Sequence, residues 1–276
     1  MHKTLATLPG LVGSSGVVMA RNTLALVAML GLCGAVGSAG AATCTTTHDE
    51  QYQGGKKPVL SNTELTQETI SVCYKEYNLY ASKITGGSLW SAEHLTKAKV
   101  AGADSITRID SNFFSEPGLA TTHASYTNSG YDRGHMMPAG DASTTTAQKE
   151  TFSVGNIVPQ TGKLNRGIWA RIENTVRIVA SSYDDAYVVT GPDFENMSTT
   201  IASGKVVVPT QTWKAVYVPQ AGVAGAYWCE NDLAPVCKVI SIDELKRTAF
   251  VDAFPGLPAA LRSQTSADWS EVLVLP

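Results

Sequence analysis

The sequence YDRGHMMP occupies residues 131–138 and places an arginine, a glycine and a histidine next to one another at Arg133, Gly134 and His135. An imidazole can take a proton from water near neutral pH, and a guanidinium fork matches the oxygens of a phosphate group. A lone histidine is more often structural than catalytic, so the chemistry of this turn depends on what surrounds it.

A second segment rich in polar side chains follows at residues 156–177. It opens with the sequence NIVPQ, and Pro159 and Gly162 prevent a helix from starting before about Leu164. From there, apolar residues that recur every four positions predict a face toward the core, namely Ile168, Ile172 and Val176. A second row with the same spacing holds Asn165, Trp169, Glu173 and Arg177. Because four residues advance about 400° around a helix, this row stays on one stripe and could supply a metal ligand, an acid and a phosphate clamp near the histidine.

Alternating or continuous apolar runs elsewhere predict β-strands, at residues 72–80, 186–192, 206–209 and 212–218. A capping box at Ser241–Glu244 predicts a helix that runs to about Phe250. The polar, Thr-rich residues 43–66 predict an exposed lead-in. Strands and helices do not alternate regularly, so the sequence predicts an α+β fold with a largely antiparallel sheet.

The N-terminal residues have the pattern of a secretory signal peptide. Arg21 precedes a short apolar run at residues 23–36, and an Ala-x-Ala site follows at residues 39–41. A retained membrane anchor would need about 20 apolar residues, and this run is shorter. We therefore expect residues 1–42 to be removed, with an upstream start before Met19 that adds no structure, and we expect a secreted or periplasmic protein without a stable membrane anchor.

The cysteines agree with export. Removal of 42 of the 276 residues leaves 234 residues with four cysteines, an even number that fits two disulfides in an exported protein. Three connectivities are open, and sequence proximity favours pairing Cys44 with Cys73 and Cys229 with Cys237. A metal site made of these four is a poor alternative, because no Cys-x-x-Cys pair is present. The length fits a single domain over residues 43–276.

The charge of the chain excludes nucleic-acid binding through bulk electrostatics. The 276 residues hold 21 Lys+Arg and 24 Asp+Glu, a net charge of −3, and loss of Lys3 and Arg21 brings the mature chain to −5. Residues 131–177, by contrast, hold six basic and four acidic side chains, a local net charge of +2. Any nucleic-acid function must therefore come from this local region.

Taken together, these residues resemble the DNA/RNA non-specific endonuclease family, which includes secreted bacterial nucleases and mitochondrial endonuclease G. The resemblance rests on Asp132–His135, Asn156-x-x-Pro159-Gln160, Asn165, Trp169 and Glu173. Its core covers about residues 131–177, and weaker similarity extends upstream to Arg108 and Phe113. The resemblance implies the ββα-metal (His-Me finger) nuclease fold, with a largely antiparallel central sheet and flanking helices. The four cysteines lie outside the shared core.

The resemblance implies a catalytic role for His135, Arg133, Glu173 and Asn156. His135 would be the general base, with its ring held by a backbone carbonyl. Asn165 would bind Mg²⁺ directly and Glu173 would hold the ion through water, with Mn²⁺ or another divalent cation as an alternative. Asn156 would order the site through hydrogen bonds.

Three arginines are candidates for binding the substrate phosphate, namely Arg133, Arg108 and Arg177. Asp132 would pin Arg133 or its loop. Contacts to the phosphate backbone carry little sequence information, so DNA and RNA are the expected partners, and no protein partner can be inferred.

The sequence therefore leaves three functions from different classes open. The first is a secreted, Mg²⁺-dependent endonuclease without preference for the sugar. The second is a non-catalytic nucleic-acid-binding module on the same fold, which loss of His135 or Asn165 would favour; both are present. The third is a metal-dependent phosphodiesterase acting on small or lipid substrates. The conjunction of motifs favours the first.

Overall fold

The computed structural model describes Cys44 and residues 48–109, 112–269 and 271–276. The predicted signal peptide, residues 1–42, lies outside this part of the chain. Among the described residues, no helix combines the length and the apolar character needed to cross a membrane.

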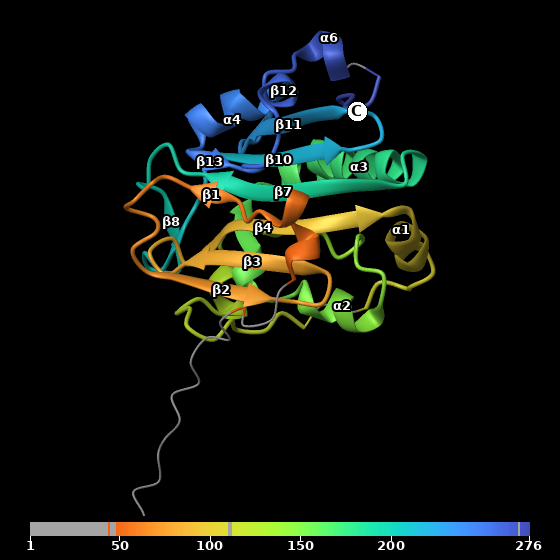
Figure 1. The fold of residues 1–276 in the computed structure, drawn as a ribbon. Helices are drawn as coiled ribbons and strands as arrows, with labels where there is room; N and C mark the ends of the chain where they lie inside the picture. Colours follow the sequence, from red (N-terminus) through yellow and green to blue (C-terminus); the bar gives the residue numbers. More distant parts are fainter. Residues whose placement is uncertain (1–43, 45–47, 110–111, 270) are drawn as a thin grey trace, which may run out of the picture. The chain divides into compact units, whose positions relative to one another are not determined.

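A seven-stranded sheet forms the centre of the fold (Figure 1). Its strands follow the order β12-β11-β10-β7-β4-β3-β2, and every neighbouring pair is antiparallel. The strands are β2 (Thr69–Cys73), β3 (Tyr77–Ser82), β4 (Gly87–Thr96), β7 (Asp185–Asp193), β10 (Gln211–Val218), β11 (Val223–Glu230) and β12 (Cys237–Ile240). The predicted α+β fold with a largely antiparallel sheet is confirmed.

Both faces of this sheet are buried, because neighbouring residues of a strand point to opposite sides. On β7, Val188 belongs to the core that helix α3 (Ala170–Ser182) covers, whereas Val189 belongs to the core that α4 (Ile242–Thr248) covers. Burial of each such aliphatic side chain contributes about 1.5–3 kcal/mol relative to exposure. The two-sided burial explains why β7 is a mainly apolar run in the sequence.

Three sequence predictions of local structure are wrong in detail. The strand predicted at residues 206–209 is only two residues long, Val206–Val207. Residues 72–80 do not form one strand, because the chain turns back after β2 and continues as β3, with the Tyr74 amide donating to the Tyr77 carbonyl. The alternating pattern continues across this hairpin, so it hides the turn. The helix that the capping box predicts, α4, ends at Thr248 and not at about Phe250; at Phe250 φ is +56°, so the backbone has left the helix.

A separate small hairpin carries the Asp-Arg-Gly-His motif. Strands β5 (Asp132–His135) and β6 (Ile157–Gln160) pair antiparallel, with His135 opposite Ile157. A π-helical turn, η5 (Leu164–Trp169), and then α3 follow β6. Two strands followed by a helix are the ββα arrangement that the resemblance implies. Gly134 is required here, because a Cβ atom at this position would overlap the side chain of Gln160.

The remaining elements are short. The helices are η1 (Asp49–Gln51), η2 (Gln53–Gly55), α1 (Lys97–Asp104), η3 (His123–Tyr126), α2 (Thr145–Glu150), η4 (Val154–Asn156), α5 (Ala259–Arg262) and α6 (Ser266–Trp269). The strands are β1 (Val59–Leu60), β8 (Thr200–Ile201), β9 (Val206–Val207) and β13 (Val251–Asp252).

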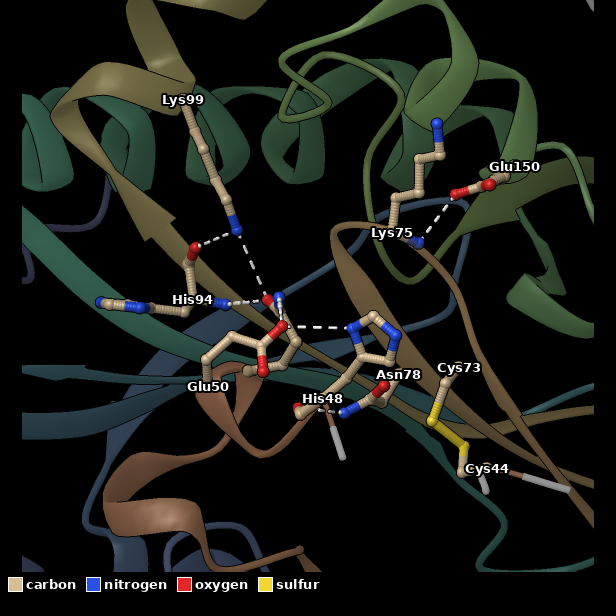
Figure 2. Close-up of polar contacts among 10 residues, drawn as sticks. Cys44, His48, Glu50, Cys73, Lys75, Asn78, His94, Lys99 and Glu150 are labelled. Carbon is tan, nitrogen blue, oxygen red and sulfur yellow. Dashed lines mark hydrogen bonds and ion pairs between the residues drawn. A yellow bond between two sulfur atoms is a disulfide. The ribbon is translucent and has the colours of Figure 1, made fainter. Parts of the chain in front are cut away.

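The lead-in predicted over residues 43–66 is exposed only in part: within its described residues 48–66, Gln51, Tyr52, Pro58 and Leu65 are buried, and Gln51 and His48 make hydrogen bonds to residues of the sheet. The Gln51 side chain accepts a hydrogen bond from the His94 amide (2.9 Å), and the Asn78 amide donates to the His48 carbonyl (2.9 Å; Figure 2). Tyr52 joins the core beside Trp90. Polar side chains in this segment serve as hydrogen-bond partners, so polarity alone does not indicate exposure here.

The described cysteines form the two disulfides that sequence proximity favours. Cys44 is bonded to Cys73 (Figure 2), and Cys229 to Cys237. The first ties the N-terminal segment to the end of β2, and the second joins β11 to β12, where the two residues lie opposite each other.

We expect both disulfides to be found in protein isolated without reducing agents, because both pairs are bonded in the fold. Mass mapping of non-reduced proteolytic peptides should show Cys44–Cys73 and Cys229–Cys237. Four free thiols in protein recovered from outside the cytoplasm would contradict this pairing.

Candidate active site

A cavity of about 580 Å³ opens where the β5–β6 hairpin meets η5 and α3. Its lining includes almost every polar residue that the sequence analysis singles out. These are Arg108, Asp132, Arg133, His135, Asn165, Glu173 and Arg177, together with Phe113, Tyr131, Pro138, Ala139, Gly140, Arg166 and Ala170. Residues 108 and 177 are far apart in sequence, and the fold brings them into one hollow.

His135 is the last residue of β5, and its ring is held by aromatic packing. The ring lies 5.6 Å from Phe113 and 5.3 Å from Phe152, measured between centroids. Burial, with a smaller effect of the Arg108 charge, lowers the pKa of His135 to about 3, so the imidazole is neutral at physiological pH. The resemblance implies that a backbone carbonyl holds this ring, but no such carbonyl partner is found among the described residues. The Nε2 atom of the ring is buried without a hydrogen bond.

Asn165 lies in η5 and is oriented by a carboxylate of the hairpin. Its Nδ2 donates to Asp132 Oδ2 (3.0 Å), so Oδ1 is the remaining polar atom of a side chain that lines the cavity. Asp132 also accepts from Arg166 Nε (2.7 Å). Of the two roles predicted for Asp132, holding Arg133 is wrong, because the carboxylate faces η5 and is occupied there. Its bonds to Asn165 and Arg166 fit the other predicted role, holding the loop in place.

Glu173 lies on α3, one face of which closes the cavity. Its carboxyl group is half-buried, and this burial raises its pKa to about 7. The positive charges of Lys214, Arg177 and Arg108 oppose the shift. Near neutral pH the group is therefore poised between its protonated and ionised forms.

The donor set suits a hard divalent cation. Asn165 and Glu173 both offer oxygen atoms to the cavity. Among the described residues, no three His, Cys, Asp or Glu side chains are grouped so that they could hold a metal ion. Mg²⁺ accepts neutral amide and carboxylate oxygens and keeps several waters, so a small protein contribution of this kind fits it.

Arg133 and Arg108 stand at the mouth of the cavity on aromatic side chains. The Arg133 guanidinium lies 5.4 Å from the Phe113 ring and 5.7 Å from the Tyr126 ring, and its Nη2 donates to the His123 carbonyl. Arg108 is exposed and lies 5.9 Å from the Phe152 ring. Cation–π contacts hold these charges without neutralising them, so both remain available to an anion.

Arg177 lines the cavity and forms an ion pair with the buried carboxylate of Asp141. Its Nη1 donates to Asp141 Oδ1 (2.6 Å), and Asp141 is 1% exposed. Asp141 follows His135 by six residues in an irregular segment, so no periodic pattern in the sequence points to the pair. This ion pair fixes the direction from which Arg177 enters the cavity.

Asn156 does not line the cavity, because it is completely buried behind it. Its Nδ2 donates to the carbonyls of Met137 (2.9 Å) and Thr151 (3.0 Å), and its Oδ1 accepts from the Met137 amide (2.9 Å) and Ser91 Oγ (2.7 Å). All four bonds are internal. This geometry supports an ordering role for the segment that follows His135.

Trp169 does not share the stripe of Asn165, Glu173 and Arg177, which corrects the sequence prediction. It is fully buried in the core, and Ala170 lines the cavity instead. The cause is the π-helical turn, in which Gly167 has non-helical angles (φ −102°, ψ −114°). A π-turn inserts one residue into the helical repeat, so the four-residue row is displaced by one position at this point.

Three charged residues around the cavity had no role predicted from the sequence: Arg166, Asp141 and Lys214. Lys214 lies behind the site, fully buried, and donates to Thr190 Oγ1 (2.7 Å). A single lysine within the apolar run at residues 212–218 is the signal that could have revealed it, because an ammonium group is rarely buried without partners.

Comparison with known proteins agrees with this geometry. A model of the DNA/RNA non-specific endonuclease family matches residues 52–260. Nuclease C1 of Cunninghamella echinulata var. echinulata is 35% identical over 178 residues, which cover 59% of this chain and 68% of that protein. Human mitochondrial nuclease EXOG is 34% identical over 233 residues, 74% of this chain and 63% of that protein. A crystal structure of the EndoG/EndoGI complex superposes with a TM-score of 0.63 and 26% identity, covering 69% of this chain and 88% of that one.

Proposed function

The chain belongs to the DNA/RNA non-specific endonuclease family and is a nuclease, and on this premise we propose a metal-dependent endonuclease that hydrolyses DNA and RNA with little sequence specificity. One observation carries the proposal: a neutral imidazole, an amide oxygen, two carboxyl groups and four guanidinium groups line a single cavity. These are the groups that phosphodiester hydrolysis needs for proton transfer and for neutralising phosphate charge.

His135 is the proposed general base. With its pKa lowered to about 3, the ring stays neutral and can accept a proton from the attacking water. The charge of Arg108 contributes to this lowering. A substrate phosphate that binds Arg108 offsets this charge, so the imidazole becomes a stronger base when substrate is present.

Members of the family depend on a divalent metal, and Mg²⁺ is the ion proposed here, with Mn²⁺ or another divalent cation as the alternative. Asn165 would hold it through Oδ1 and Glu173 through water. When bound, such an ion stabilises the negative charge that develops on the phosphate and on the leaving oxygen. Asp132 keeps the Asn165 amide in the required orientation.

Arg133, Arg108 and Arg177 are proposed to bind the phosphate backbone. Guanidinium groups match phosphate oxygens, and contacts of this kind position a nucleic acid without reading its bases. The local net charge of +2 over residues 131–177, in a chain that is acidic overall, supports a basic cleft of limited extent. Nucleic acid is therefore the proposed substrate, and both sugars are expected to be accepted.

Export is proposed on two grounds. The two disulfides are typical of an oxidising compartment. The second ground is the signal-peptide pattern in residues 1–42, which is typical of an N-terminal targeting sequence. We therefore propose a secreted or periplasmic enzyme whose single domain spans residues 43–276.

The decisive experiment incubates the purified protein with plasmid DNA and with RNA, in Mg²⁺ or in EDTA. Conversion of supercoiled plasmid to linear fragments and degradation of RNA, both abolished by EDTA, would support the proposal. Binding without cleavage would indicate a non-catalytic module. Cleavage of small or lipid phosphodiesters alone would indicate a different phosphodiesterase.

The metal requirement is expected to depend on pH through Glu173. Burial raises its pKa to about 7, and the carboxyl group must be ionised to help hold a cation. Lowering the pH from 7 to 6 should therefore raise the Mg²⁺ concentration for half-maximal cleavage about fivefold. Titrations with Mg²⁺ at both pH values measure this, and Glu173→Gln should remove most of the difference. An identical requirement at both pH values would exclude Glu173 as the titrating group.

A further inference from the structure

Thr161 joins the β5–β6 hairpin to η5, and all of its polar atoms are engaged. Its carbonyl accepts from the Asn165 amide (2.9 Å), and its Oγ1 accepts from the Leu164 amide (3.2 Å). This hydroxyl also donates to the Asp232 carbonyl (2.7 Å). The backbone position of Asn165 therefore depends on where Thr161 is held.

Asn231, which follows β11, holds the backbone of Thr161. Its Oδ1 accepts from the Thr161 amide (2.8 Å), and its Nδ2 donates to the carbonyls of Pro159 and Pro209 (both 2.9 Å). One side chain thus connects the end of β6, the start of η5 and the segment before β10. Asn231 lies outside the cavity lining, so it touches neither the substrate site nor the groups proposed to bind metal.

The loop that presents Asn231 is closed by a disulfide. Cys229 and Cys237 bridge the ends of β11 and β12, and the Glu230 amide donates to the Val236 carbonyl just inside the bridge. The loop gains little from apolar burial, because Leu233 is 75% exposed and Val236 is 63% exposed. Its shape therefore rests on the disulfide and on its hydrogen bonds.

We propose that Asn231 is a positioning residue for Asn165, acting through Thr161, and that the Cys229–Cys237 disulfide fixes the loop from which it acts. The proposal rests on the proposed function for the metal role of Asn165. Its structural part concerns how residues 161–169 are held, and this part can be measured without metal.

Hydrogen–deuterium exchange of the metal-free protein tests the structural part. Asn231→Ala should speed exchange of the amides in residues 161–169 by about tenfold, because the opening of a local hydrogen-bonded unit then costs less. The matched control is Asn78→Ala, which removes a buried asparagine whose side-chain amide, like that of Asn231, donates to a backbone carbonyl, here that of His48 (Figure 2). Asn78→Ala should lower the melting temperature and leave exchange in residues 161–169 unchanged.

Magnesium titration tests the functional part. Asn231→Ala should raise the Mg²⁺ concentration for half-maximal cleavage about tenfold, the size typical of groups that orient a ligand, with a small change in KM for DNA. Thr161→Val should act in the same direction, and Thr161→Ser, which keeps the hydroxyl, should recover most of the loss. Replacing Cys229 and Cys237 by serine should shift the metal requirement, whereas replacing Cys44 and Cys73 should affect stability alone.

The outcomes separate this proposal from the proposed function. Unchanged exchange in residues 161–169 in Asn231→Ala, or equal changes in Asn78→Ala, would overturn the positioning role. If Asn165→Ala, measured alongside, leaves the Mg²⁺ requirement unshifted, the proposed metal site fails. The exchange data would then still decide whether Asn231 holds η5.

Discussion

Replacement of His135 by alanine is expected to lower kcat/KM for plasmid cleavage at least about 100-fold, because a positioned general base contributes about 10²- to 10⁴-fold. His135 is the one imidazole among the residues that line the cavity in the described part of the chain. The arginines and the metal-binding groups are untouched by this change. DNA binding should therefore survive, and time courses of plasmid nicking beside fluorescence anisotropy in EDTA measure the two properties separately.

His94 provides the matched control for this prediction. Its ring stacks on Tyr187 with centroids 4.1 Å apart, and its Nε2 is 2.8 Å from Asp185 Oδ2, away from the cavity. His94→Ala should reduce stability while leaving cleavage near the wild-type rate. If His135→Ala retains more than a few per cent of wild-type activity in a folded protein, His135 is not the base.

Two strands of the central sheet, β7 and β10, could be predicted from sequence, because residues 186–192 and 212–218 are mainly apolar and are buried on both faces. The Gly191-Pro192 pair lies inside β7 and does not end it. Strands β4, β11 and β12 were not predicted; in β4, buried polar residues such as Ser91 and Glu93 interrupt the apolar pattern. The hairpin between Cys73 and Tyr77 could not be located in the same way. Both of its strands alternate apolar and polar residues, so the pattern contains no break at the turn.

The residues of the candidate site could largely be predicted from the sequence, but their arrangement along the helix could not. The Asp-Arg-Gly-His motif and Asn165 do meet in one cavity. The regular helical row through Trp169 fails because Gly167 leaves helical geometry and adds one residue to the turn. Gly167 is the visible signal in the sequence, since glycine is unfavourable near the start of a helix.

Pairings between distant residues were beyond the reach of local patterns. Asp132 engages Arg166 across 34 positions, and Asp141 engages Arg177 across 36. Each pair forms when β5, or the segment that connects it to β6, packs against η5 and α3. A spacing rule for one helix or one strand contains no information about such a contact.

Replacement of Asn165 by alanine is expected to raise the Mg²⁺ concentration for half-maximal cleavage and to lower turnover. Both effects should be larger than those of groups that act on a metal ligand indirectly, which typically cost about 10- to 100-fold. Asn165 offers Oδ1 directly to the cavity, whereas Glu173 is proposed to act through water, so Glu173→Ala should be less severe. Metal titrations at saturating DNA measure the requirement, and melting curves measure stability.

The alternative explanation for Asn165 is a structural one, a cap at the helix start. The structure argues against it, because the Asn165 side chain donates to Asp132, and the side chain that accepts from the first amide of η5 belongs to Thr161. Asp132 keeps its bonds to Arg166 after the substitution, so the expected loss of stability is about that of one hydrogen bond, 0.5–1.5 kcal/mol. Asn174→Ala, an exposed position on α3, controls for truncating an asparagine in the same helix. An Asn165→Ala protein with lowered stability and an unshifted Mg²⁺ requirement would remove this residue from the metal site and leave it as a purely structural link between η5 and the hairpin.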